Sequence, residues 1–185
     1  MGIASWPGFI NDWGSTEAER TARYPCERLV ARPDLVLHRA LDVGAPAATV
    51  FRWLCQLRAA PSSYDLLDNG GRRSPQELTP GLERLEPGQR MMKVFRLVEH
   101  EPGVSVTMLS EGRLFGRVAC TYRVGEPSPG RSRLVVKLLV ERPSRTPAAR
   151  ALNFILPPGD LVMMRRQLMN LRRLAEAQDA AAAGL

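Results

Sequence analysis

Lysine and histidine are scarce in this sequence, which limits both its basic chemistry and its proton-transfer chemistry. Of the 26 lysine and arginine residues only Lys93 and Lys137 are lysine, so the net charge of +7 comes almost entirely from arginine. The planar guanidinium binds phosphate and carboxylate through paired hydrogen bonds, so the charge allows an anionic membrane surface, nucleic acid or an acidic ligand as partner. A GC-rich gene explains the same excess of arginine, and we favour that interpretation.

Cysteine is limited to Cys26, Cys55 and Cys120. The number is odd and the spacings exclude a zinc site or a CxxC redox pair. We expect three reduced thiols in a cytoplasmic protein. Cys55 and Cys120 fall on apolar patterns, where cysteine acts as a small hydrophobic residue.

Long apolar runs are also missing. No segment reaches 18 uninterrupted apolar residues, so we expect no membrane span. The first residues, MGIASWPGFINDWG, lack the basic and apolar regions of a signal peptide. With 185 residues, 44% of them hydrophobic, the chain suits one domain with a sizeable core. We expect no metal and no cofactor.

The first half of the chain alternates between irregular and periodic segments. Residues 1–33 show no clear period and predict an N-terminal arm with a short helix near 15–23. Residues 35–43 (LVLHRALDV) predict a strand, and Pro46 is well placed to open a helix that ends near residue 58. Apolar residues recur along that helix at helical spacing and give it one buried face.

Residues 61–90 predict a long ordered loop, because they are polar and rich in glycine and proline. Its most concentrated polar cluster contains Tyr64, Asp65, Asn69 and Arg72. These side chains could close the mouth of a cavity and bind a ligand's polar end. Alternatively, they could pair with one another to satisfy the loop's own backbone.

From residue 91 the hydrophobic period changes to two, which predicts an antiparallel meander with one solvated face. The strands are expected over 91–98, 104–109, 116–124 and 133–140. Along the third, Val118, Cys120, Tyr122 and Val124 share one face. Arg117, Ala119, Thr121 and Arg123 share the other.

A long amphipathic helix is predicted at the end of the chain, after a connector over residues 141–158. Asp160 is a suitable N-cap, and the helix is expected to reach about Ala177, with a frayed tail over 179–185. Gln167 is the one polar residue within the apolar arc. It could face a ligand, or it could tie the helix to the loop after residue 60.

This order of elements predicts an α+β helix-grip fold over residues 34–178, in which a curved antiparallel sheet wraps around the long C-terminal helix. Residues 46–78 (PAATVFRWLCQLRAAPSSYDLLDNGGRRSPQEL) resemble a bacterial subgroup of the SRPBCC, or START-like, superfamily. Residues 163–171 resemble that superfamily's last helix. The chain departs from the pattern at Phe51 and Leu66, where tryptophan is common.

The resemblance implies a cavity for a hydrophobic small molecule, such as a lipid or a polyketide-like compound. It implies no particular reaction, because the superfamily contains carriers, sensors and cyclases. We predict ligand binding or transport by a monomer or homodimer, with no specific nucleic-acid partner. The predicted ligand contacts are Trp53, Tyr64, Asp65, Asn69, Arg72, Tyr122 and Gln167.

Two alternatives stay open. The chain could be a polyketide cyclase or dehydrase that uses His100 or Asp65 as a base. His38 and Cys55 are expected to be structural instead. The chain could also dock on a partner or a membrane surface through the arginines of its last helix.

Overall fold

The computed structural model describes residues 7–63, 74–112, 116–141 and 147–184. Six antiparallel strands form one sheet in the order β1-β6-β5-β4-β3-β2. The strands are β1 (Leu35–Val43), β2 (Arg90–Met91), β3 (Phe95–Glu101), β4 (Ser105–Gly112), β5 (Gly116–Ser128) and β6 (Arg131–Glu141). The helices are α1 (Gly8–Asn11), α2 (Glu17–Thr21), η1 (Pro25–Arg28), α3 (Ala47–Cys55), η2 (Gln56–Arg58) and α5 (Pro147–Ala182).

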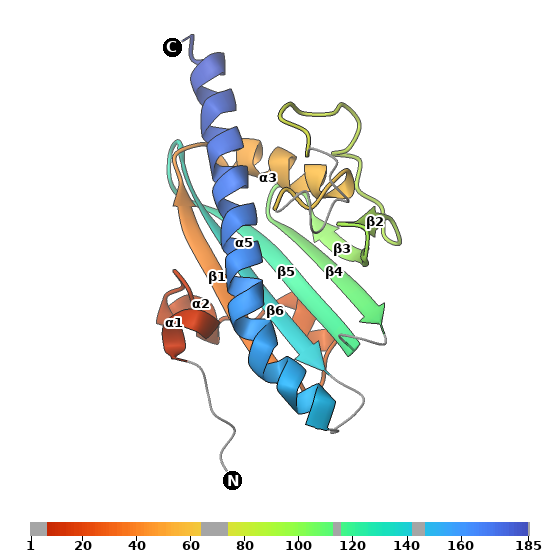
Figure 1. Cartoon of the computed structure of the whole chain (residues 1–185). Coiled ribbons are helices and arrows are strands. Elements are labelled where there is room, and N and C mark those ends of the chain that lie inside the picture. The colour runs from red at the N-terminus through yellow and green to blue at the C-terminus, as the bar shows by residue number, and fades with distance from the viewer. Residues whose placement is uncertain (1–6, 64–73, 113–115, 142–146, 185) are drawn as a thin grey trace.

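The long helix α5 lies across the curved sheet, and α3 covers the sheet beside it (Figure 1). Alternate side chains of each strand point to this inner face, as the period of two predicts. The main core therefore joins the strands to both helices, and the α+β helix-grip arrangement is confirmed. Its members on β5 are Val118, Cys120, Tyr122 and Val124.

The outer face of the sheet is not uniformly solvated, so that prediction was wrong. Residues of the N-terminal arm, among them Tyr24, Cys26 and Val30, pack on Ala119 and Val135. The arm covers polar groups as well, because the backbone N–H of Cys26 donates to Thr121 Oγ1 at 3.0 Å. A strand's alternation reports which residues share a face, but it cannot report what later covers that face.

Helix α5 is longer than predicted at both ends. It already runs through residues 147–158, which the sequence predicted to be a connector, and it continues to Ala182 instead of fraying from 179. Pro157 and Pro158 lie inside it, although proline lacks the N–H that a helix interior uses. Packing compensates there, because Leu156 lies against the main core. Asp160 consequently lies in mid-helix and is not an N-cap.

Within the described ranges, none of the helices is both long enough and apolar enough to cross a membrane.

Candidate functional site

A hydrogen-bonded polar pair lies in the interior between β5 and α5. The hydroxyl of Tyr122 donates to Gln167 Oε1 at 2.6 Å, and Gln167 Nε2 donates to the carbonyl oxygen of Pro61 at 2.6 Å. Tyr122 is 1% exposed and Gln167 is 3% exposed. Burial raises the pKa of Tyr122 well above its usual value, so its hydroxyl remains a donor and does not act as a base at neutral pH.

Two methionine sulfurs border this pair. Tyr122 Oη lies 3.6 Å from Met164 Sδ, and Gln167 Nε2 lies 3.1 Å from Met92 Sδ. The backbone of Met92 has a φ of 43° and that of Lys93 has a φ of 65°, the left-handed region that side chains rarely adopt. The N–H of Met92 donates to the carbonyl oxygen of Leu57 in η2 at 2.8 Å, which holds this turn against the helix. Methionine is flexible and polarizable, so this border can adapt in shape.

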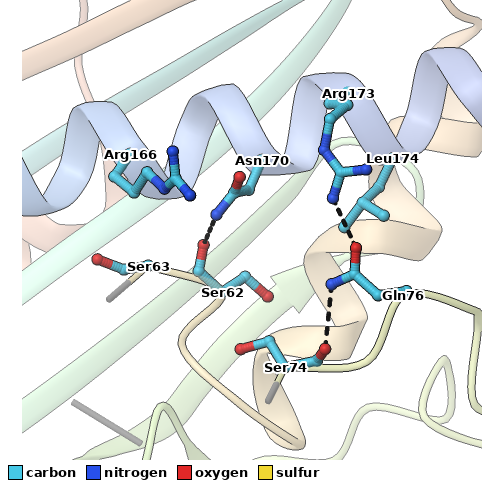
Figure 2. Close-up of a pocket in the computed structure, with 8 residues that line it drawn as sticks. All are labelled: Ser62, Ser63, Ser74, Gln76, Arg166, Asn170, Arg173 and Leu174. Carbon is cyan, nitrogen blue, oxygen red and sulfur yellow. Dashed lines mark hydrogen bonds between the residues drawn. The ribbon is translucent and has the colours of Figure 1, made fainter. Parts of the chain in front are cut away.

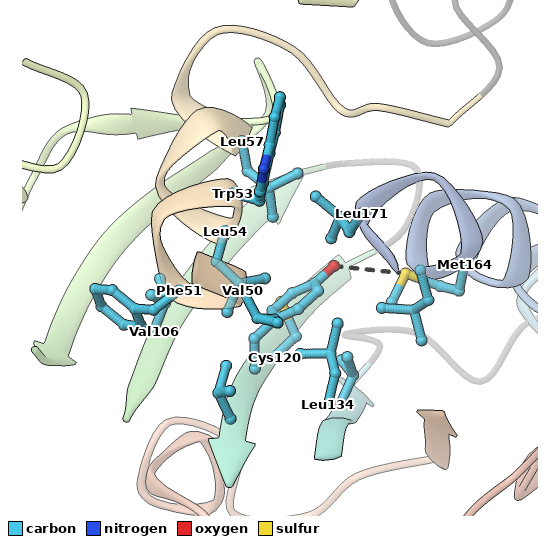
Figure 3. Close-up of a cluster of buried hydrophobic side chains, with 14 of the residues drawn as sticks. Val50, Phe51, Trp53, Leu54, Leu57, Val106, Cys120, Leu134, Met164 and Leu171 are labelled. Atoms are coloured by element: carbon cyan, nitrogen blue, oxygen red, sulfur yellow. Dashed lines mark hydrogen bonds between the residues drawn. The ribbon is translucent and has the colours of Figure 1, made fainter. Parts of the chain in front are cut away.

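Trp53 joins the same core from α3. Proline at position 46 precedes the first turn of α3, and the helix buries Val50, Trp53 and Leu54 on one face. Figure 3 shows side chains of α3, the sheet and α5 converging around this region. The indole Nε1 of Trp53 is buried and has no hydrogen-bond partner in the described part of the chain. A buried donor without an acceptor is uncommon and calls for an explanation.

Beside this interior lies a polar surface pocket of about 340 Å³, formed where α5 meets the segments at residues 62–63 and 74–76 (Figure 2). Its lining residues are Ser62, Ser63, Ser74, Gln76, Arg166, Asn170, Arg173 and Leu174. A second surface pocket of about 500 Å³ lies at the edge of the sheet along β3 and includes Phe95 and Leu97. Neither is a closed apolar cavity, so the enclosed cavity expected from the sequence stays a prediction.

Sequence reasoning missed a buried ion pair between β1 and α5. Arg39 is 1% exposed, and its Nη2 lies 2.8 Å from Asp160 Oδ2. Its Nη1 donates to the carbonyl oxygen of Asn11 at 2.7 Å, so one guanidinium joins the arm, the sheet and α5. Burial raises the pKa of Asp160 to about 6, although Arg39 opposes the shift. A signal was present, because Arg39 takes an inward position between Leu37 and Leu41 on β1.

Solved structures of other proteins share this architecture. A protein from Thermobifida fusca solved by NMR aligns with a TM-score of 0.50 and 17% identity, over 75% of this chain and 94% of that one. The hypothetical protein jhp0584 from Helicobacter pylori aligns with a TM-score of 0.53 and 14% identity, over 83% and 95%. The chain therefore shares the helix-grip fold of these proteins. No protein-family model and no curated protein matches the sequence.

A weaker likeness involves the di-domain ARO/CYC BexL from the BE-7585A biosynthetic pathway. The TM-score is 0.49 at 13% identity, and the alignment covers 76% of this chain and 46% of BexL. Similarity at this level does not bear on the activity of this helix-grip chain.

The helix-grip fold brings three of the predicted contact residues into one core. Trp53, Tyr122 and Gln167 share it. Of the two roles predicted for Gln167, the structure shows the one in which it ties the helix to the start of the loop. Whether these three contact a ligand stays a prediction. Tyr64, Asp65, Asn69 and Arg72 lie outside the described residues, and their roles stay predictions too.

The fold does not place the titratable residues considered for the cyclase alternative at the Tyr122–Gln167 pair. His38 lies on the sheet face opposite to Leu37 and Arg39, where Nδ1 is 2.9 Å from Asp12 Oδ1, and burial lowers its pKa. His100 is half-buried on β3, and Asp65 lies outside the described residues. Cys55 is a buried core thiol as expected, and burial raises its pKa to about 12.

Proposed function

We propose that this chain binds an apolar small molecule, of lipid or polyketide-like character, in the region bounded by Trp53, Tyr122 and Gln167 beneath α5. The observation that supports the proposal is the buried indole N–H of Trp53, which lacks an acceptor in the described part of the chain. An unpaired buried donor costs about 1–3 kcal/mol. A ligand with a carbonyl or hydroxyl oxygen would supply the missing acceptor.

The core that Trp53 shares with Tyr122 suits such a ligand. Met92 and Met164 are unbranched side chains that can change rotamer to make room. The Tyr122–Gln167 pair provides a second polar position, where a ligand oxygen could replace the contact between the two side chains. The ligand's remaining surface would then lie against aliphatic side chains of α3 and α5.

Two naphthalene probes test the polar contact at Trp53. The probe 2-acetylnaphthalene carries an acceptor oxygen, whereas 2-ethylnaphthalene has a similar shape without one. We expect both to displace the neutral dye N-phenyl-1-naphthylamine from the protein, with the acetyl compound bound more tightly. Trp53→Phe should lower the affinity for the acetyl compound about tenfold and remove its advantage, as expected for the loss of one hydrogen bond.

Trp13→Phe is the matched control, because Trp13 lies in the arm with its ring under Arg165. This variant should leave both affinities unchanged. If the dye and both probes fail to bind the wild-type protein, the proposed function is wrong. Native mass spectrometry of protein purified from its own host would identify the ligand class directly.

A further inference from the structure

Helix α5 presents a row of apolar side chains to solvent. Ile155, Val162 and Met169 are 63%, 54% and 49% exposed, and successive members of this outward row lie seven residues apart. Because seven residues make almost two full turns of an α-helix, the three side chains lie in line along about 21 Å of the helix. In Figure 1 α5 lies in front of the sheet, and no labelled element passes in front of it. A row of this kind marks a contact surface, whereas single exposed apolar residues do not.

The outward row is separate from the face that α5 buries. Met164, Leu168 and Leu171 pack into the main core, and they lie on the opposite side of the helix from the row. Packing of the single chain therefore does not explain apolar residues at the outward positions.

Arginines flank the outward row. Arg165 lies three residues after Val162, and Arg172 lies three residues after Met169, so both occupy the same side of the row. Arg173 follows Met169 by four residues and lies on the other side. All three arginines are exposed. The outward face of α5 thus combines apolar side chains with guanidinium groups at their margins.

Acidic side chains do not balance this charge. Between residues 154 and 175 the sequence has one acidic residue, Asp160, and its carboxylate pairs with the buried Arg39. Glu176 lies just beyond this segment and offsets one charge, that of Arg172. The outward face of α5 is therefore cationic.

We propose that this face of α5 docks on an anionic lipid surface, with the outward row inserted and the arginines at the level of the phosphates. Guanidinium groups bind phosphate through paired hydrogen bonds. Their aliphatic stems lie along apolar surface while the charge stays in the head-group layer. Because the row is narrow, binding should be reversible and should require anionic lipid.

The same face suits a partner helix less well. Helices that pack through a seven-residue repeat need a second apolar position, three residues after the first. Here Arg165 and Arg172 occupy that position. In a pair of identical chains the arginines of one copy would also lie beside those of the other, and like charges oppose association.

Vesicle flotation tests the proposal. We expect the protein to bind vesicles of phosphatidylcholine with about 30% phosphatidylglycerol, to bind pure phosphatidylcholine at least about tenfold more weakly, and to be released by about 0.5 M salt. Arg165→Gln should weaken binding about fivefold, the effect of one arginine near an anionic surface. Val162→Asp should weaken it more than about tenfold, because it removes an inserted side chain and adds a negative charge.

Val94→Asp is the matched control. Val94 is also an exposed valine, but it lies between β2 and β3 at the far edge of the sheet. This variant should bind the anionic vesicles as the wild type does. An equal loss in both variants would attribute the effect to net charge and overturn the site. Failure of the wild-type protein to bind anionic vesicles at low salt would overturn the proposal.

A fluorescent label tests insertion separately from adsorption. The native cysteines are buried, so a nitrobenzoxadiazole label added to the folded Val162→Cys variant should react at the new thiol. Its emission should shift to the blue with anionic vesicles, whereas that of labelled Val94→Cys should not. Bound protein without this shift would show adsorption by charge alone and contradict insertion of the outward row.

Other occupants of this face give different results. A dimer in sedimentation velocity that Val162→Asp dissociates would make the face an interface between copies, and the lipid proposal would be wrong. Binding to polyglutamate but to neither kind of vesicle would point to an acidic protein and would overturn it as well. Val162→Asp should still release N-phenyl-1-naphthylamine to the naphthalene probes, so failure of lipid docking leaves the proposed function standing.

Discussion

At the scale of single residues, Asp160 connects protonation to stability. Its pKa in the folded chain is about 6 against an ordinary 3.8, so the folded state holds the proton more tightly than the unfolded state does. Stability from this group is therefore fully present below about pH 4 and is lost as the pH rises through 6.

We predict that Asp160→Asn removes this pH dependence, because the amide keeps an oxygen that can accept from Arg39 but does not ionise. Urea unfolding of both proteins at pH 4, 5, 6 and 7 measures the effect. The unfolding free energy of the wild type should fall relative to that of Asp160→Asn as the pH rises from 4 to 7. Asp42→Asn, which changes an exposed carboxylate on the same strand, should give no such trend. Parallel curves for wild type and Asp160→Asn would contradict the prediction.

The Tyr122–Gln167 pair gives a second prediction at this scale. Tyr122→Phe leaves only Gln167 Oε1 without its donor, whereas Gln167→Leu removes the partners of both the Tyr122 hydroxyl and the Pro61 carbonyl. At about 1–3 kcal/mol per unpaired group, Gln167→Leu should be the more destabilising change. Because the two residues are in contact, the double variant should lose less stability than the sum of the two. Additive losses in thermal or urea unfolding would show that the pair is not coupled.

At the scale of elements, helix α5 contains an avoidable weakness. Gly159 has no left-handed φ, and a Cβ added there would meet no atom within 4 Å. Gly159→Ala should therefore stabilise the protein by about 0.5–1 kcal/mol, since alanine loses less conformational entropy in a helix. Gly103 is the opposite case, because its φ is 76°, and Gly103→Ala should destabilise. Equal effects of the two substitutions on the melting temperature would refute the argument.

The N-terminal arm supplies a second test for an element. Val30 is 3% exposed and belongs to the cluster that covers the outer face of the sheet. Val30→Ala should cost about 1.5 kcal/mol, from two buried methylene equivalents. Val36→Ala on β1, where the side chain is 39% exposed, is the control and should cost much less. If urea unfolding shows that Val30→Ala loses no more stability than Val36→Ala, packing of the arm contributes little to stability.

The elements also show what the sequence can predict. Alternation located β1 at Leu35–Val43 to the residue and identified the inward face of β5, because both depend on local periodicity. The start of α5 was mispredicted because Pro157 and Pro158 act locally as helix breakers, while packing of the helix on the sheet is a long-range effect. Arg39 was overlooked because its partner Asp160 lies on a distant element. The candidate site was found only in part, since Ser62 and the pocket require the tertiary structure.

At the scale of the whole molecule, the three thiols are distributed over both faces of the sheet. Cys26 lies under the arm, while Cys55 and Cys120 belong to the main core. Burial raises the pKa of all three, which suppresses the reactive thiolate. We predict that 5,5′-dithiobis(2-nitrobenzoate) modifies none of them in the native protein and three per chain in 6 M guanidinium. Fast modification of a thiol in buffer alone would contradict this.

The pairing of β1 with β6 has a consequence for biosynthesis. Leu35 pairs with Val140 and Val43 pairs with Ser132. The first strand to leave the ribosome, β1, therefore cannot pair until β6, the last strand of the sheet, has been synthesised. Non-local pairings of this kind slow folding, and an unpaired apolar strand is prone to aggregate meanwhile. We therefore expect the hairpins from β3 to β6 to form first in the nascent chain, with β1 joining them last as the segment most in need of a chaperone.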